Sequence, residues 1–255
     1  MKSVMFKKSV VYATLLAAAM ASGQASAAAI SLSNSDFESG LTGWNTIGAV
    51  ATTPSTTVTT HDNIVWTIGA AGSAMAQLQS SGSTIGSIES ILGLAAGSLN
   101  ALNTNANDGD LTNGSALYRA FSASAGDSIS FAWDYVATDY IPFNDPAFAL
   151  LIGPDASIEV LASIHGLGMA VGTSGHSGWQ TFSETLDVTG DYTIAFVTTN
   201  DKDTVLNSHL FIDNVAGSCN PTCPPPVNNV PEPGSMALAG LALAGFAATR
   251  RRKSV

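Results

Sequence analysis

The segment from Asp127 to Val136 constrains the fold more than any other part of the chain. Small or polar residues alternate there with four large apolar ones: Ile129, Phe131, Trp133 and Tyr135. Successive side chains of a strand point to opposite faces, so this period of two buries one face and leaves the other free. The pattern predicts a β-strand in a sheet that covers a hydrophobic core on one side.

Similar short runs, separated by Gly, Asn, Asp and Ser, recur from Ile30 onward. They predict strands at Thr56–Thr60, Asn63–Ile68, Ala74–Gln79, Ala147–Ile152, Ser157–Ala162, Trp179–Val188, Tyr192–Thr198 and His209–Val215. Apolar residues at helical spacing between Ile85 and Leu102 predict instead a short helix at the sandwich edge, with Gly93 in its interior. Asn103–Asn113 is predicted to be a surface loop, because its acidic residues miss the EF-hand spacing. The body is therefore expected to be an all-β sandwich with one helical insertion.

The N-terminus has the features of a secretory signal peptide. Three lysines within the first eight residues precede the apolar run Val10–Met20, and Ala25-Ser26-Ala27 offers small residues for cleavage. The apolar run is too short to cross a membrane as a helix, which needs about 20 residues. We expect residues 1–27 to be removed on export.

The charge distribution excludes most anionic partners. Apart from the leader and a basic cluster at the C-terminus, the chain has two basic residues, Arg119 and Lys202, against 18 carboxylates. A body with a formal charge of −16 repels phosphate backbones and anionic lipid headgroups. We therefore expect no nucleic-acid partner, whereas divalent cations and neutral glycans are compatible with this charge.

The two cysteines of the chain, Cys219 and Cys223, lie in a Pro-rich stretch. In an oxidising compartment they are expected to form a local disulfide, and the alternative is free or intermolecular thiols. Zinc would need further Cys or His ligands nearby, and the stretch has none. We predict that residues 218–229 form an extended Cys- and Pro-rich linker.

The tail has three elements in a fixed order. Pro231-Glu232-Pro233 is followed by the apolar run Met236–Ala248 and by a basic cluster: Arg250, Arg251, Arg252 and Lys253. Together they resemble the PEP-CTERM sorting signal of Gram-negative bacteria, which membrane proteases called exosortases cleave. The resemblance implies that residues 230–255 insert transiently into the inner membrane as a hydrophobic helix, with the basic end in the cytoplasm. A helix of this run spans only about 20 Å, and a permanent anchor or a buried helix is the alternative.

Two segments at the ends of the body carry a further resemblance. Asn34-Ser35-Asp36-Phe37-Glu38, followed by Gly43-Trp44, is similar to the first strand of carbohydrate-binding-module-like jelly rolls, and Leu210–Val215 is similar to their last strand. The resemblance implies that residues 28–217 form a jelly-roll-like β-sandwich whose terminal strands lie side by side. It also implies a structural Ca²⁺ held by Glu38 and Asp213, with Asp36 as a weaker ligand, since hard oxygen ligands suit this ion. The alternative is that these are solvated edge carboxylates.

The middle of the body is similar to a recurring ectodomain of PEP-CTERM proteins. The resemblance rests on short motifs from Leu92 to Asp145, among them Phe131-Ala132-Trp133 and the loop Asp139-Tyr140-Ile141-Pro142-Phe143-Asn144-Asp145. Such ectodomains usually carry an aromatic residue where Pro146 stands here. In this loop Asp139, Asn144 and Asp145 are a second, weaker candidate for a cation site. The alternative is that they cap the turn before Ala147.

No motif of the body predicts catalysis. Gly175-His176-Ser177-Gly178-Trp179 is close to the nucleophile elbow G-x-S-x-G, but Trp179 occupies the last glycine position. The four histidines, His61, His165, His176 and His209, lack the spacing of a metal site. Carboxylates are too abundant for any pair to indicate glycoside hydrolysis. We therefore expect that the protein is not an enzyme.

The leading hypothesis is an exported, noncatalytic protein of the cell surface or the exopolysaccharide matrix that binds glycan. The alternatives are a secreted glycan-active enzyme and a purely structural biofilm component. Glycan-binding sites present exposed aromatic rings. The exposure of Trp44, Trp66, Tyr140 and Trp179 therefore discriminates between these hypotheses, since buried rings would favour the structural role.

Overall fold

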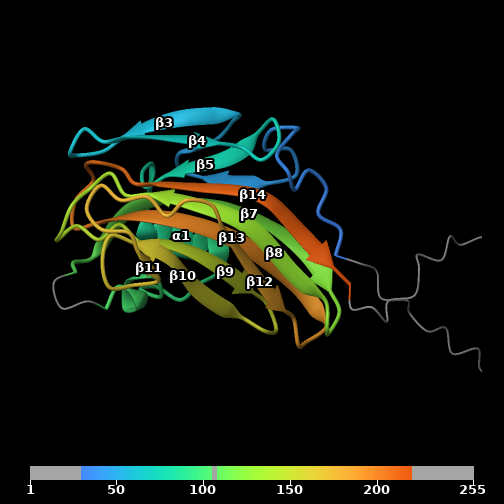
Figure 1. Cartoon of the computed structure of the whole chain (residues 1–255). Helices are drawn as coiled ribbons and strands as arrows, with labels where there is room; N and C mark the ends of the chain where they lie inside the picture. The colour runs from blue at the N-terminus through green and yellow to red at the C-terminus, as the bar shows by residue number, and fades with distance from the viewer. Residues whose placement is uncertain (1–29, 105–107, 220–255) are drawn as a thin grey trace, which may run out of the picture.

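The computed structural model of the protein describes residues 30–104 and 108–219 (Figure 1). The signal peptide, most of the predicted linker and the sorting signal lie outside these residues. The described strands form two large sheets that face each other and a small third sheet. The predicted all-β sandwich is confirmed, and it is jelly-roll-like. No helix in the described ranges is long and apolar enough to span a membrane.

The first sheet has seven strands in the order β1-β7-β13-β9-β10-β11, with β6 also paired to β7. All its pairs are antiparallel except β10 with β11. Its strands are β1 (Asn45–Ile47), β6 (Ser83–Thr84), β7 (Leu111–Ala123), β9 (Ala147–Ile152), β10 (Ser157–Ser163), β11 (Met169–Ala170) and β13 (Gly190–Asp201).

The second sheet has five antiparallel strands in the order β12-β8-β14-β5-β2. They are β2 (Val50–Thr53), β5 (Met75–Gln79), β8 (Ser128–Val136), β12 (Gln180–Thr185) and β14 (His209–Ser218). The alternation predicted over β8 is confirmed, because Ile129, Phe131, Trp133 and Tyr135 are all buried in the core between the two sheets. Phe131 meets Phe196 of the opposite sheet edge-to-face, with 4.8 Å between ring centroids.

The outer face of the seven-stranded sheet is covered by the helical segment. Helix α1 (Ile85–Leu92) and the 3₁₀ helix η1 (Asn100–Leu102) follow β6, and Ile88 packs with Phe148 and Leu150 of β9. The helix is confirmed, but it covers a face and not the edge, because β9 and β13 are apolar on both faces. Gly93 ends α1 with a φ of 72°, so it serves as the C-cap instead of weakening the helix interior.

The outer face of the five-stranded sheet is half covered. The hairpin of β3 (Ser55–Thr59) and β4 (Val65–Gly69) lies over β5 and β14 in Figure 1. Val58 and Ile68 pack there on Met75, Val136 and Phe211. Towards β12 the same face is open to solvent, as the exposed residues of that strand show.

Two sequence predictions need correction. The longest strand, β7, was not predicted, and it begins at Leu111 inside the segment assigned to a surface loop. Asn34–Glu38, assigned to a first strand, forms turns, because Asn34 and Phe37 adopt φ values of 53° and 58° that a strand does not allow. The turn still lies beside the last strand, since the Val215 N–H donates to the Ser35 carbonyl at 3.0 Å.

Candidate functional site

The predicted calcium ligands meet where this turn joins β14. The carboxylate of Asp213 accepts hydrogen bonds from the backbone N–H groups of Ala71 at 2.9 Å and of Asn214 at 2.7 Å. Glu38 accepts hydrogen bonds from the N–H of Ser73 at 2.6 Å and from the hydroxyl of the same residue. The two carboxylates therefore both hold residues 71–74, which lead into β5.

We call the place where Glu38 and Asp213 hold residues 71–74 the seam. The negative charges of the carboxylates at the seam repel each other. Burial raises the pKa of Asp213, and the nearby negative charges of Glu38 and Asp36 raise it further. Hydrogen bonds from Ser73 lower the pKa of Glu38. Within the part of the chain that the structure describes, no group of three or more His, Cys, Asp and Glu is arranged to hold a metal. Because a carboxylate offers about four lone pairs, these hydrogen bonds leave acceptor sites, and calcium here stays a prediction.

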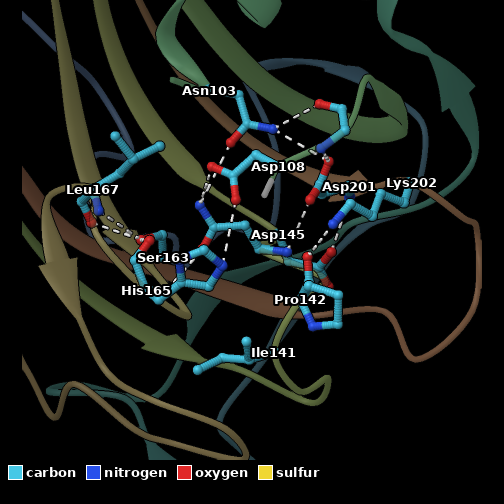
Figure 2. Close-up of polar contacts among 12 residues, drawn as sticks. Asn103, Asp108, Ile141, Pro142, Asp145, Ser163, His165, Leu167, Asp201 and Lys202 are labelled. Carbon is cyan, nitrogen blue, oxygen red and sulfur yellow. Dashed lines mark hydrogen bonds and ion pairs between the residues drawn. The ribbon is translucent and has the colours of Figure 1, made fainter. Parts of the chain in front are cut away.

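The second predicted cluster lies in a buried polar network (Figure 2). Asp145 has a φ of 47°, and its carboxylate accepts hydrogen bonds from the Asp201 N–H at 2.9 Å and from the Ser208 hydroxyl at 2.8 Å. The side-chain oxygen of Asn144 accepts the His165 N–H at 2.8 Å. Asp139 accepts the N–H of Tyr140 at 2.8 Å. Most of these contacts join the loop to distant residues and do not cap the turn before Ala147, so the cation site and the turn cap both stay predictions.

Asp201 is the member of this network that the sequence analysis missed. Its carboxylate accepts the N–H groups of Gly109 at 2.9 Å and Asn144 at 3.1 Å, and the amide of Asn103 at 3.2 Å. Figure 2 shows Asn103 and Asp201 pointing toward each other. No sequence signal could have found Asp201, because its partners come from stretches about 60 to 100 residues away.

Burial makes the carboxyl groups of this network resist ionisation. It raises the pKa of Asp139 to about 6, and the carboxylates of Asp203 and Asp201 add to the increase. Burial likewise raises the pKa of Asp145 well above its ordinary value and raises that of Asp201. The network thus fixes the loops at one end of the sandwich and contains buried carboxyl groups that are protonated more easily than exposed ones.

The four aromatic residues differ in exposure. Trp44 is buried in the core, where its ring meets Phe37 and Phe196. Trp66 and Tyr140 are partly exposed, and their rings lie tilted against those of His176 and His61, with centroids 4.7 and 4.3 Å apart. Trp179 is 37% exposed, and its indole N–H donates to the Gly69 carbonyl at 3.1 Å. Of the four rings, that of Trp179 is exposed, and its hydrogen bond to Gly69 holds it in place.

Trp179 borders the open half of the outer face of the five-stranded sheet. Three residues of β12 are exposed on this face: Thr181, Ser183 and Thr185. They pair with Ala132, Ser130 and Ser128 of β8. The surface beside the indole is therefore a flat area of small side chains and hydroxyl groups. We call these six residues with Trp179 the open face.

The rejected elbow motif lies next to this surface. The His176 imidazole Nε2 is 2.8 Å from the Asp134 carboxylate, and the Ser177 hydroxyl donates to the same carboxylate at 3.1 Å. In a nucleophilic triad the serine bonds to the histidine and the histidine to the carboxylate. Here both residues bond to Asp134, so the arrangement does not activate the serine.

The comparison with protein families decides what the tail is. Residues 229–253 match the model of the PEP-CTERM protein-sorting motif. The chain carries this sorting signal. The matched segment includes Pro231, Glu232, Pro233 and the arginines of the basic cluster, as the sequence predicted. Since the motif directs sorting after export, the protein is exported. Cys219 is partly exposed, but Cys223 lies outside the described residues, so the disulfide stays a prediction.

Solved structures that resemble the body share little sequence with it. TmCBM61, solved with β-1,4-galactotriose, is 12% identical, with 73% of this chain and 95% of that chain covered and a TM-score of 0.39. A family 16 carbohydrate-binding module is 11% identical, with coverages of 72% and 96% and a TM-score of 0.34. The K3 adhesin domain of Lys-gingipain from Porphyromonas gingivalis W83 is 15% identical, with coverages of 74% and 99% and a TM-score of 0.37. No curated protein matches.

Proposed function

We propose that the protein is a noncatalytic, exported glycan-binding protein whose ligand lies on the open face. The exposed indole of Trp179 carries the proposal. Sugar rings have apolar faces that stack on aromatic rings, and a fixed indole loses little conformational entropy on binding. The hydroxyl groups of β12 next to it can exchange hydrogen bonds with sugar hydroxyls.

The charge of the body narrows the ligand class. The open face contains no Lys or Arg, and the body has 18 carboxylates. An anionic polysaccharide would be repelled unless a divalent cation bridged the charges. We therefore propose neutral exopolysaccharide as the ligand. Ca²⁺ at Glu38 and Asp213 would stabilise the fold, with Asp36 in support, and would not contact the sugar.

A glycan-array screen of the purified protein, with and without Ca²⁺, tests this function. Trp179→Ala should weaken binding of each neutral glycan that the wild type retains by about tenfold, as expected for loss of one stacked ring. Tyr140→Ala is the matched control, because this partly exposed ring lies by His61 at the other end of the β3–β4 hairpin. If Tyr140→Ala abolishes binding and Trp179→Ala does not, the open face is not the site.

We propose further that an exosortase cleaves the tail near Pro231–Pro233 and releases the body to the cell surface or matrix. Gly217 lies against Ile30, so both ends of the described body leave the sandwich together. Mass spectrometry of the extracellular protein should find an N-terminus near residue 28 and no peptide from Arg250 to Val255. Recovery of that basic cluster from extracellular material would contradict the cleavage.

A further inference from the structure

The backbone departs from regular pairing just before Trp179. The Ser177 N–H donates to the Tyr135 carbonyl at 2.9 Å, and Gln180 pairs with Trp133. Two residues, Gly178 and Trp179, therefore lie opposite the single residue Asp134. This is a β-bulge, a device that re-aims a side chain where a strand begins. Gly178 supplies the φ of 62° that the bulge uses.

A single carboxylate holds the residues that lead into the bulge. Asp134 is only 1% exposed, and its two oxygens lie 2.8 and 2.9 Å from the His176 Nε2. One of them also accepts the Ser177 hydroxyl, whose oxygen in turn accepts the Tyr135 N–H at 2.8 Å. Asp134 thus fixes two consecutive residues, His176 and Ser177, immediately before the bulge.

The segment from Ser174 to Trp179 is also in contact with Trp66, and it contains Trp179 itself. The ring of Trp66 lies tilted against that of His176, and its indole N–H donates to the Ser174 carbonyl at 3.0 Å. The indole N–H of Trp179 reaches across to Gly69 at the end of β4. Residues 174–179 therefore lie between β8 and the β3–β4 hairpin, and their position determines where both indoles lie.

We propose that Asp134 and His176 are positioning residues for Trp179, so that acid, by neutralising the buried Asp134 carboxylate, loosens the bulge and weakens glycan binding. This inference rests on the proposed function. His176 is the titratable group that contacts Asp134 within the described residues. On β14 the residue opposite Asp134 is Phe211, and two titratable residues lie diagonal to Asp134: His209, which pairs with Val136, and Asp213, which pairs with Ala132. From the β3–β4 hairpin, the uncharged ring of Trp66 lies against His176.

The direction of the effect follows from burial. Burial raises the pKa of Asp134, and the hydrogen bond and charge of His176 oppose that increase. As the pH falls through this raised value, the carboxylate loses the charge that strengthens its bonds to His176 and Ser177. The two residues before the bulge are then held less firmly. Binding is expected to be full near neutral pH and to decline in acid.

Nuclear magnetic resonance of the ligand-free protein tests the positioning by itself. The indole N–H signals, assigned with single Trp→Phe variants, are followed from pH 7.5 to pH 4.5. The signals of Trp66 and Trp179 should move together with one midpoint. The Trp44 indole, which donates to the Asn34 carbonyl at 3.1 Å, should stay in place as an internal control. In Asp134→Asn the Trp66 and Trp179 signals should hold their acid positions at every pH.

Cellohexaose, a neutral oligosaccharide, serves as the probe for binding. Wild-type affinity should fall at least tenfold between pH 7.5 and pH 4.5, whereas Asp134→Asn should bind weakly and without this pH dependence. His176→Gln should bind weakly too, and its decline should move to higher pH, because Asp134 loses the partner that lowers its pKa. If the Trp66 and Trp179 signals of Asp134→Asn lie at the wild-type positions of pH 7.5, the positioning role is overturned, whatever the binding result. Moving signals with pH-independent cellohexaose affinity would overturn the coupling to binding. If the wild type binds no glycan on the array, the proposed function fails, while the indole signals still decide the positioning role.

Discussion

Asp145→Ala should lower the free energy of unfolding by about 3 kcal/mol or more. The substitution leaves the Asp201 N–H and the Ser208 hydroxyl buried without their acceptor, and each such group costs about 1–3 kcal/mol. Alanine also tolerates the φ of 47° less well than Asp or Asn. Urea denaturation of the purified protein measures the loss.

Asp145→Asn is the matched variant for this experiment. Asn keeps an acceptor for the Asp201 N–H and adopts the left-handed conformation readily, so its loss at pH 7 should be under about 1 kcal/mol. Asp62→Ala, at an exposed position, should change stability by at most about 0.5 kcal/mol. Equal losses for Asp145→Ala and Asp62→Ala would show that the network does not hold the loops together.

The same position sets part of the pH dependence. Because burial raises the pKa of Asp145, the folded protein keeps this proton at pH values where the unfolded chain, with an ordinary pKa of about 3.9, has lost it. Stability should therefore fall as the pH rises from about 4 toward the raised folded value. In Asp145→Asn this decline should be shallower. It should not vanish, since the pKa values of Asp139 and Asp201 are raised too.

Much of the sandwich could be predicted because its strands bury one face each. The alternation over β8 and the apolar run of β9 located these elements almost to the residue. β7 was missed because its middle packs on both faces, while its start, Leu111-Thr112-Asn113-Gly114, has the composition of a loop. Gly114 is needed there, because a Cβ would lie 2.3 Å from the Thr198 carbonyl oxygen on the neighbouring β13. Local composition does not reveal such a close approach.

The candidate sites were predictable only in part, for a different reason. Asp145, Asn144 and Asp139 stood out as a polar loop, but the partners of this loop, Asp201, Ser208 and His165, come from distant parts of the chain. The bulge that exposes Trp179 depends on a two-to-one pairing with β8, which only the register reveals. Sequence patterns report burial along one element, whereas these sites are defined by contacts between elements.

Calcium at 100 times its dissociation constant should raise the free energy of unfolding by about 2.7 kcal/mol, if it binds at the seam as proposed. The structure gives this prediction a physical basis. Glu38 and Asp213 come from opposite ends of the body and hold the same residues, 71–74. The pKa of Asp213 is raised partly by the charges of Glu38 and Asp36. A bound cation would replace this repulsion with attraction and join the first turn, the loop before β5 and the last strand.

The decisive comparison uses two double variants that remove the same charge. Glu38→Gln with Asp213→Asn removes the predicted ligands, whereas Asp187→Asn with Asp191→Asn removes two exposed carboxylates elsewhere. Melting is measured in Ca²⁺ and in Mg²⁺ at equal ionic strength, so that general screening of the acidic body affects all proteins alike. The wild type and the control should gain stability in Ca²⁺, and the seam variant should not. Equal gains in both double variants, or no gain in the wild type, would exclude Glu38 and Asp213 as calcium ligands. Hydrogen bonds alone would then join the first turn, residues 71–74 and the last strand.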